Sequence, residues 1–411
     1  MDRYPQVGAA RRNAVYLLEL AGEDDPFARQ EAAAVASRVT PLAPGLAVAC
    51  GLDGERVRGL AYTRRASGLL GYADATVESA RCLLEAASIG RRGTVAVRAR
   101  DVRGRTGIDT PRAERELGAV LVERGFAVDL DAPDHELRAV FAAPSDRSTN
   151  DGPSDTKPTA ETSASGAVVD EGLNDTGCSD TDSTGENGTQ GVCALAWLVA
   201  ESSRTFGERM PTEKPFFQPG AMDPLLARAV ANVAGAGPGR TIVDPMCGTG
   251  GILVEAGLVG SNTVGLDAQT KMVRGARTNL TRYLGASGPD GNGRGDENGD
   301  ESDDDGKGRE SEFAVIRGDA TRVPLRDGIA DGICFDVPYG RQSKIAGDLG
   351  SLVRSALAEA YRLAPRTVVV GDRPWTGAAR EAGWEVESTF ERWVHRSLTR
   401  HIAVLERASP A

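Results

Sequence analysis

Short apolar runs separated by stretches of helical spacing mark the first 144 residues. The apolar runs predict strands, at residues 14–20, 45–51, 93–99, 127–130 and 137–142. Apolar positions that recur every three or four residues predict helices between them, at residues 25–38, 76–87 and 111–125. Strand and helix signals therefore alternate through this first block.

A further apolar run, at residues 192–200, predicts a strand beyond a long polar segment. That segment, residues 145–190, is rich in Gly, Ser, Thr, Asp and Asn. It cannot bury enough apolar surface to offset the entropy lost on ordering, so we expect a disordered insert. The strand at 192–200 is then predicted to pair with residues 137–142 across the insert. The first domain accordingly spans residues 1–203.

Strands and helices alternate regularly from residue 206 to residue 411. Strands are predicted at residues 240–244, 262–267, 313–317, 332–336 and 367–371. Helices are predicted at residues 251–258, 270–284 and 348–363. Two final strands, near 384–393 and 397–406, are expected to close the sheet as a hairpin. The spacing is typical of a parallel α/β sheet, and a second polar segment at 285–312 is expected to be a disordered insert.

The acidic residues are concentrated in the two inserts. The chain carries a formal net charge of −11, yet residues 145–190 hold ten acidic and two basic residues, and residues 285–312 hold ten and three. The remainder is therefore mildly basic, which suits contact with nucleic acid. Acid-rich loops with few lysines indicate either a halophilic host or a genome rich in GC codons, and the composition does not separate these two.

Some arginines of the first domain are candidates for phosphate contacts. The alternative is an arginine-rich, solvated surface. The candidates are Arg91, Arg92, Arg98, Arg100, Arg103 and Arg105.

Cysteine and histidine usage argues against a metal site. The six cysteines include no C-x-x-C pair, and the three histidines are scattered. We therefore expect reduced thiols and no metal. No apolar run approaches the roughly 20 residues needed to span a bilayer, and the N-terminus does not resemble a signal peptide. These features predict a cytoplasmic protein.

A glycine-rich turn follows the predicted strand at 240–244. Its sequence is Asp244-Pro245-Met246-Cys247-Gly248-Thr249-Gly250-Gly251. Glycines let the backbone approach a ligand closely, and they expose amide N–H groups at the start of a helix. The turn lacks both the P-loop lysine and the dinucleotide fingerprint. Because a carboxylate such as Asp244 suits an ammonium group, we interpret the turn as a site for the methionine part of S-adenosylmethionine. The alternative is a tight turn without a ligand.

Acidic residues also end the next two predicted strands. Asp267 follows the glycine turn at a sequence spacing that is typical of a carboxylate binding ribose hydroxyls. Asp319, followed by Ala320, ends the third strand, where it can accept a hydrogen bond from the adenine amino group. Each aspartate taken alone could instead be a cap or a solvated turn residue.

The most informative segment follows the fourth strand. It reads Asp336-Val337-Pro338-Tyr339-Gly340-Arg341. A ring amine is a poor nucleophile because its lone pair is delocalised. Transfer of a methyl group to it needs acceptors aimed at its N–H groups and a flat surface that fixes the base. The Asp336 carboxylate and the Pro338 carbonyl can be the acceptors, and Tyr339 can stack on the base.

This segment resembles the (D/N)PP(Y/F) motif of class I amino-group methyltransferases, which modify adenine N6, cytosine N4, guanine N2 or glutamine. Val337 departs from the motif, which usually has a second proline there. Since the expected acceptors are Asp336 and Pro338, we expect activity to survive this change.

Other segments resemble the archaeal tRNA (guanosine-10 N2)-dimethyltransferase family. Residues 214–232 resemble the segment before that family's glycine turn, and residues 395–400 resemble its closing hairpin. Residues 97–101 and 128–134 resemble a THUMP domain preceded by a ferredoxin-like partner. The resemblance covers the chain except for the two inserts. It implies a ferredoxin-like/THUMP α+β domain followed by a Rossmann-like class I methyltransferase domain over residues 206–411.

The resemblance also implies a methyl donor, a substrate and site residues. The donor is S-adenosylmethionine without a metal, and the substrate is tRNA. Some relatives need a small zinc-binding activator protein. The candidate catalytic residues are Asp336, Pro338 and Tyr339. The candidate cofactor contacts are Gln218, Pro219, Asp244, Met246, Cys247, Gly248, Thr249, Gly250, Asp267, Asp319 and Ala320.

Two other functions stay open at this point. One is N2-methylation of a guanine elsewhere in tRNA or in ribosomal RNA. The other is RNA binding by a non-catalytic THUMP protein. Methylation of DNA adenine is less favoured because the N-terminal segments resemble an RNA-binding module.

Overall fold

The computed structural model describes residues 14–22, 24–144, 191–285, 311–338, 348–396 and 398–408. The predicted disorder of residues 145–190, and of nearly all of 285–312, lies outside these described residues. The chain divides into two compact units. The first comprises Met1–Arg58 and Tyr62–Ser202, and the second comprises Gly59–Ala61 and Ser203–Ala411.

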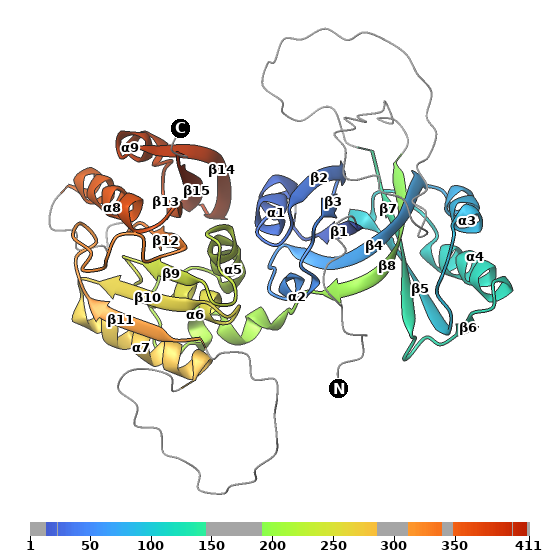
Figure 1. Ribbon diagram of the computed structural model, residues 1–411, viewed down its shortest axis with the longest axis horizontal. Helices are drawn as coiled ribbons and strands as arrows, with labels where there is room; N and C mark the ends of the chain where they lie inside the picture. Colours follow the sequence, from blue (N-terminus) through green and yellow to red (C-terminus); the bar gives the residue numbers. More distant parts are fainter. Residues whose placement is uncertain are drawn as a thin grey trace, which may run out of the picture. The chain divides into compact units, whose positions relative to one another are not determined.

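The first unit is built on one mixed sheet (Figure 1). Within the described residues it has eight strands in the order β2-β3-β1-β4-β8-β7-β5-β6. The strands are β1 (Val15–Leu20), β2 (Arg38–Ala43), β3 (Leu46–Cys50), β4 (Thr63–Asp74), β5 (Thr94–Asp101), β6 (Ala127–Val128), β7 (His135–Ala142) and β8 (Val192–Glu201). The helices are α1 (Asp25–Ala32), α2 (Gly54–Val57), α3 (Val77–Ala86), α4 (Thr110–Glu123) and the short η1 (Val102–Gly104). β5 pairs in parallel with β6 and β7, and the other pairings are antiparallel.

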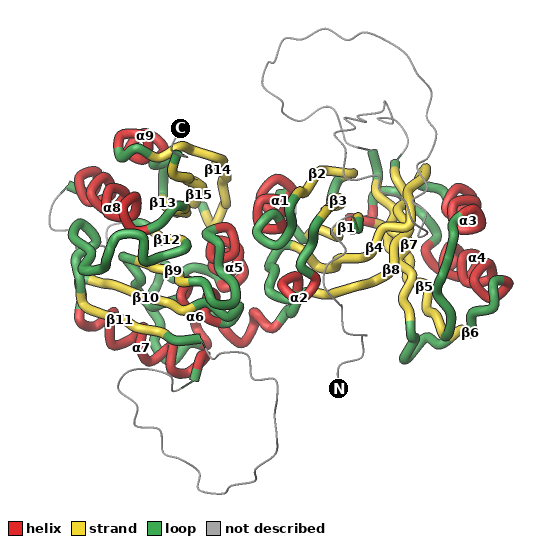
Figure 2. Tube along the Cα trace, in the orientation of Figure 1, coloured by secondary structure: helices red, strands yellow, loops and turns green. Residues whose placement is uncertain are grey.

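Helices α3 and α4 cover one face of this sheet (Figure 2). Leu84 and Leu117 pack from the helices onto Phe141 and Leu195 of β7 and β8. Aliphatic side chains at helical spacing meet alternate residues of the strands there, and apolar burial of this kind is the main stabilising term of such a layer.

The predicted pairing across the first insert is confirmed. Strands β7 and β8 pair antiparallel from Leu137↔Trp197 to Ala142↔Val192. Other predictions failed. The helix expected at residues 25–38 ends at Ala32, because Ser37 N donates to the Cys50 carbonyl at 2.9 Å and begins the β2–β3 hairpin.

Four elements of the first unit were not predicted, namely β2, α2, β4 and the short η1. Strand β4 is a central, twelve-residue strand, but its sequence TRRASGLLGYAD contains two glycines and lacks regular alternation. Its long pairings with β1 and β8 make it a strand despite that composition.

A buried ion cluster ties β1 to β5 and β7. Glu19 is 2% exposed, and its carboxylate accepts hydrogen bonds from Arg138 Nε at 2.9 Å and Arg100 Nη1 at 2.8 Å. Arg103 pairs with Asp25 at 2.5 Å. Arg100 and Arg103 are therefore engaged within the unit, although both were candidates for phosphate contacts.

Four cysteines have free thiols in the part of the chain that the structure describes, namely Cys82, Cys193, Cys247 and Cys334. Cys50 is disulfide-bonded. The expectation of reduced thiols is therefore wrong for Cys50.

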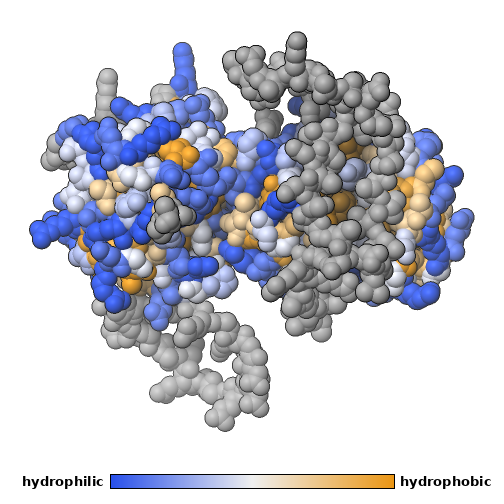
Figure 3. Space-filling model, turned by 45° about the horizontal axis from the view of Figure 1, so that its top comes forward, coloured by the Kyte–Doolittle hydropathy of each residue, from blue (hydrophilic) through white to orange (hydrophobic). Residues whose placement is uncertain are grey.

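The face shown in Figure 3 is mostly hydrophilic where described residues are visible, with apolar residues in small separate groups. No helix among the described residues is both long and apolar enough to cross a bilayer.

The second unit is a three-layer α/β/α arrangement (Figures 1 and 2). Its sheet has seven strands within the described residues, in the order β11-β10-β9-β12-β13-β15-β14. They are β9 (Thr241–Asp244), β10 (Asn262–Asp267), β11 (Phe313–Arg317), β12 (Gly332–Asp336), β13 (Arg366–Gly371), β14 (Trp384–His395) and β15 (Leu398–Arg407). The helices are α5 (Pro224–Val233), α6 (Gly251–Gly257), α7 (Thr270–Leu284), α8 (Leu349–Leu363), α9 (Thr376–Glu381) and the short η2 (Thr205–Arg209) and η3 (Pro211–Glu213).

Strands β9 to β13 are parallel, whereas β15 runs antiparallel between β13 and β14. All five parallel strands are confirmed at or within one residue of the predicted bounds, and the closing hairpin is confirmed within two residues of its predicted bounds. Helices α5 and α9 were not predicted. Residues of α8 and α9 pack on one face of the sheet, and residues of α6 and α7 on the other.

The order of the strands creates a switch point between β9 and β12. From β9 the chain moves through β10 to β11 in one direction, and then returns to β12 and continues to β13 in the other. Connections on either side of such a point leave the sheet in opposite directions, so a crevice opens at the carboxyl ends of the strands. The functional site is therefore expected at the carboxyl ends of β9 and β12.

Gly332, at the start of β12, provides a test of this packing. A Cβ added there would lie 1.8 Å from the Ala234 carbonyl oxygen, at the end of α5. Since a backbone atom cannot swing aside, Gly332→Ala should lower the free energy of unfolding by about 3 kcal/mol or more. Gly377→Ala, in α9, is the control because a Cβ there meets nothing within 4 Å. Denaturant titration compares the two, and equal stabilities would contradict the tight α5–β12 contact.

Candidate active site

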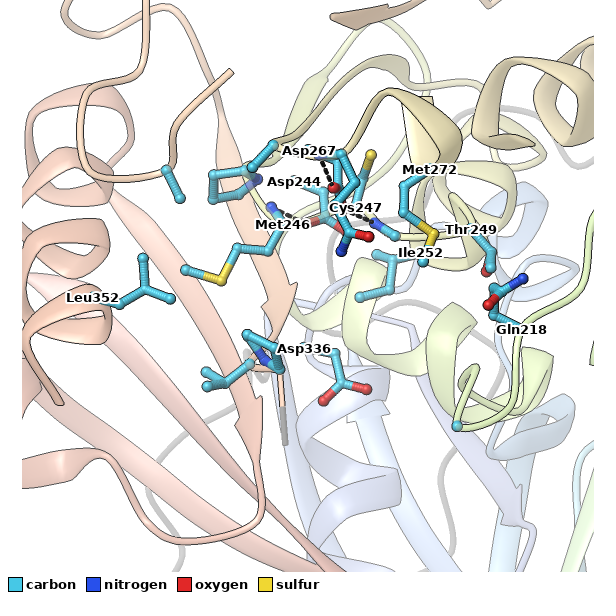
Figure 4. Close-up of a pocket in the computed structure, with 18 of the residues that line it drawn as sticks. Gln218, Asp244, Met246, Cys247, Thr249, Ile252, Asp267, Met272, Asp336 and Leu352 are labelled. Atoms are coloured by element: carbon cyan, nitrogen blue, oxygen red, sulfur yellow. Dashed lines mark hydrogen bonds between the residues drawn. The ribbon is translucent and has the colours of Figure 1, made fainter. Parts of the chain in front are cut away.

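A cavity of about 1540 Å³ opens at the carboxyl ends of the parallel strands in the second unit. Its wall includes the residues that follow β9, β10, β11 and β12, together with the segment 218–222 and the start of α8. Figure 4 shows Asp244, Met246, Asp267 and Asp336, which come from three different strand ends, around this space. The cavity thus lies at the switch point.

The glycine-rich turn after β9 forms one wall of the cavity. Asp244 Oδ1 accepts a hydrogen bond from Met246 N at 2.9 Å, and Gly250 N donates to the Cys247 carbonyl at 2.7 Å. Gly250 has φ 76° and precedes α6 as its N-cap. A Cβ on Gly250 would lie 2.7 Å from Leu280 Cδ1, so both its dihedral angle and its neighbours require glycine.

Asp267 joins the end of β10 to the same turn. Its Oδ2 accepts from Gly248 N at 3.2 Å, and its Oδ1 accepts from Gln269 N at 2.8 Å. Burial raises the pKa of Asp267, and these two backbone hydrogen bonds partly offset the effect. Asp267 therefore accepts backbone hydrogen bonds locally and also lines the cavity. A local structural role and a ligand-binding role are thus compatible.

Asp244 is the most deeply buried of these carboxyl groups, at 2% exposure. Burial raises its pKa well above the usual range, the hydrogen bond from Met246 N opposes this, and the nearby Asp336 and Asp267 carboxylates add to it. Taking a carboxylate out of water is costly unless a positive partner is supplied. The site is therefore prepared for a cationic group.

Asp319 and Ala320 line the cavity after β11. Asp319 Oδ1 accepts hydrogen bonds from Thr321 N at 2.9 Å and Thr321 Oγ1 at 2.8 Å. This local turn fixes the carboxylate and leaves its second oxygen as the remaining acceptor.

The segment after β12 places Asp336 and Pro338 on the cavity wall. Val337, which replaces a proline of the motif, is fully buried, and its N–H donates to the Val370 carbonyl at 2.8 Å. A proline could not make this bond. The hydrogen bonding between β12 and β13 therefore continues one residue beyond Asp336, to Val337. Tyr339 lies outside the described residues.

Carboxylates dominate the charge of the cavity wall. Among the described lining residues, six are aspartates: Asp244, Asp267, Asp319, Asp336, Asp348 and Asp372. Lys271 and His395 also line it. A cavity with this charge favours a cationic ligand and disfavours phosphate groups.

Most of the predicted site residues line this cavity. They are Gln218, Pro219, Asp244, Met246, Cys247, Gly248, Thr249, Asp267, Asp319, Ala320, Asp336 and Pro338. Gly250 lies behind the wall as the cap of α6. Several other wall residues had no predicted ligand role, although three of them belong to the segments 214–232 and 395–400 that resemble the family. They are Met222, Ile252, Lys271, Met272, Ser351, Leu352, Asp372, His395 and Leu398. These residues come from α6, α7, α8, the closing hairpin, the segment before α5 and the turn after β13. None of these segments carried a ligand motif, and the fold brings the residues together.

A buried lysine also lies next to the glycine-rich turn. Lys214 is 5% exposed, and its Nζ is 3.2 Å from the position that a Cβ of Gly251 would occupy. Burial lowers the pKa of this ammonium group, and the charge of Glu255 partly opposes the effect.

Part of the chain is similar in sequence to known methyltransferases. Residues 211–288 match the family described as RMKL-like, methyltransferase domain. A tRNA (guanine(10)-N2)-dimethyltransferase of Methanothermobacter thermautotrophicus is 34% identical over 215 residues, which is 51% of this chain and 56% of that protein. A Pyrococcus abyssi protein of the same name is 30% identical over 208 residues, 49% and 55% of the two chains.

The chain thus spans about half the length of these two curated relatives. Among solved structures, TrmN from Thermus thermophilus is 19% identical with a TM-score of 0.42, covering 96% of this chain and 100% of that one. The resemblance inferred from the motifs is confirmed as sequence similarity to archaeal tRNA (guanine(10)-N2)-dimethyltransferases.

The raised pKa of Asp244 predicts that Asp244→Asn stabilises the ligand-free protein at neutral pH. Asparagine keeps an acceptor for Met246 N without the buried charge. Because the folded pKa is raised, wild type loses stability as pH rises above the unfolded value of about 3.9. Thermal unfolding should show similar midpoints near pH 4 and a growing advantage for Asp244→Asn towards pH 7, roughly 2–4 °C for each kcal/mol. A less stable variant at pH 7 would contradict the assignment.

Proposed function

We propose that this chain is an S-adenosylmethionine-dependent methyltransferase that acts on the exocyclic N2 of a guanine in tRNA, with guanosine 10 as the first candidate position. The observation that carries the proposal is the placement of four aspartates at the ends of four neighbouring strands around one cavity. They are Asp244, Asp267, Asp319 and Asp336. The last belongs to the segment that resembles an amino-group methyltransferase motif.

The chemistry of the cavity wall fits the proposed donor. S-adenosylmethionine carries an ammonium and a sulfonium group, and when bound it supplies an electrophilic methyl group. Asp244 and the glycine-rich turn would hold the methionine part, and Asp267 would accept hydrogen bonds from the ribose hydroxyls. Asp319 would accept one from the adenine amino group. Met246, Ile252 and Met272 give the wall an apolar part.

The residues after β12 would orient the guanine. The Asp336 carboxylate and the Pro338 carbonyl would accept the two N–H groups of the amine, which fixes the nitrogen lone pair relative to the methyl donor. Acceptors that are fixed before the reaction need no reorganisation as positive charge develops on the nitrogen. Tyr339 is proposed to stack on the base.

We propose tRNA as the partner on the strength of the relatives' names and the sequence resemblance. The first unit is proposed to be the THUMP-containing module that binds the RNA, since segments of it resemble that domain. A base in a duplex must leave its stack to enter a cavity of this kind. The resemblance also predicts that a small zinc-binding activator protein is a partner, as for some relatives. The assays below should therefore be run with and without such a protein.

The proposal predicts that Asp336→Asn loses methyl transfer while keeping tRNA affinity. Asparagine keeps one acceptor oxygen but loses the charge and presents an NH₂ group, so the single-turnover rate should fall by roughly 10²–10³. The measurement is transfer of labelled methyl to tRNA beside a binding assay at matched salt. Asp327→Asn is the control, because Asp327 is 80% exposed and pairs with Arg362 on the surface. A near-normal rate for Asp336→Asn would remove this segment from the chemistry.

A further inference from the structure

An arginine of the closing hairpin reaches the proposed acceptor. Arg400, on β15, is 3% exposed. Its Nη2 lies 3.4 Å from Asp336 Oδ2 and donates to the Gly220 carbonyl at 2.9 Å. A guanidinium withdrawn from water requires partners of this kind, since an uncompensated buried charge costs several kcal/mol. Arg400 thus connects the strand end that carries Asp336 with the segment 218–222.

Asp336 needs a positive neighbour because of the charges around it. Asp244, on β9, lies close to Asp336, and a negative charge on one carboxyl group makes it more costly to ionise the other. Charged or titratable groups from several elements line the same cavity: Cys247 after β9, Asp267 after β10, Asp319 after β11, Asp348 before α8, Asp372 after β13, His395 of β14 and Lys271 of α7. Negative charges gathered in this way repel one another, so a positive partner lowers the cost of having Asp336 ionised.

We propose that Arg400 is a positioning residue that keeps Asp336 ionised and aimed at the amine of the target base. The inference rests on the proposed function, in which Asp336 is an acceptor. A protonated carboxyl group carries its own O–H, so it cannot offer both oxygens as acceptors. An opposite charge within about 4–6 Å favours the ionised form, and the structure records an ion pair between Arg400 and Asp336.

The contact with Gly220 gives the guanidinium a second function. Gly220 lies next to Gln218 and Pro219, the two predicted cofactor contacts of that segment. Because the same Nη2 holds Asp336 and the Gly220 carbonyl, the acceptor is fixed relative to the wall on the cofactor side. The register of β15 in the sheet, with Arg400 opposite Arg392 and two residues before Ile402, sets this position.

The test compares the pH dependence of single-turnover methyl transfer in wild type, Arg400→Met, Arg400→Lys and Arg240→Met. Arg240 pairs with Asp331 at the surface, with 61% of its side chain exposed, and is the matched control. The acid limb of Arg400→Met should move to higher pH by about one unit or more, so its rate is about tenfold lower below the limb and recovers in alkali. Arg400→Lys should retain most of the wild-type profile.

A purely structural role would give a different result. In that case the rate of Arg400→Met would fall by the same factor at every pH, and Arg400→Lys would not restore it. Either this uniform loss or an unchanged acid limb would overturn the inference. Thermal unfolding and calorimetric titration with S-adenosylmethionine show whether each variant is folded and still binds the donor.

Carboxyl-carbon NMR keeps the inference testable apart from the proposed function. With ¹³C-labelled aspartate, the Asp336 signal is assigned by its loss in Asp336→Asn and then titrated in wild type and in Arg400→Met. The pKa of Asp336 should be higher in Arg400→Met, and equal values would refute the role of Arg400. If wild type transfers no methyl group to tRNA but the NMR shift is seen, the proposed function fails while the coupling of the two residues stands.

Discussion

The second unit depends on the convergence of carboxylates at the ends of its parallel strands. The sheet order brings Asp244 and Asp336 to neighbouring strand ends at the switch point, and Asp267 accepts a hydrogen bond from Gly248 N in the turn that follows Asp244. Burial raises the pKa of Asp244, and the nearby Asp336 and Asp267 carboxylates add to this effect, so ionising the buried cluster costs free energy. That cost is offset when a cation enters, so the same arrangement that weakens the ligand-free protein gives the cavity its affinity for a positively charged ligand.

A second buried ion cluster joins three helical elements of the same unit. Glu255 of α6 is fully buried and accepts Arg209 Nε and pairs with Arg228 Nη2, both at 2.7 Å. The carboxylate thereby joins η2, α5 and α6. Removing one member of such a cluster leaves a buried charge unpaired, which costs about 3–5 kcal/mol. The cluster thus holds together η2 and α5, which lie on either side of the segment that carries Gln218.

Local patterns predicted the parts of the fold that are set locally. Strands β9 to β12 end where the apolar runs end, and Asp244, Asp267, Asp319 and Asp336 could be picked out because each follows such a run. Long-range pairing decided the rest. Strand β4 has the glycines of a loop but is held between β1 and β8. The pairing of Arg400 with Asp336 joins residues 64 apart and depends on the register of β15, which no local pattern specifies.

The central claim is that the cavity delivers a methyl group to N2 of a guanine in tRNA. Its most direct test is mass spectrometry of nucleosides from a tRNA transcript incubated with the protein and S-adenosylmethionine. A second transcript with adenosine at position 10 is treated alongside. The proposed function predicts N2-methylated or N2-dimethylated guanosine in the first transcript, and its loss from the second would place the target at position 10. Methylation of another base, or no methylated nucleoside in either transcript, would contradict it.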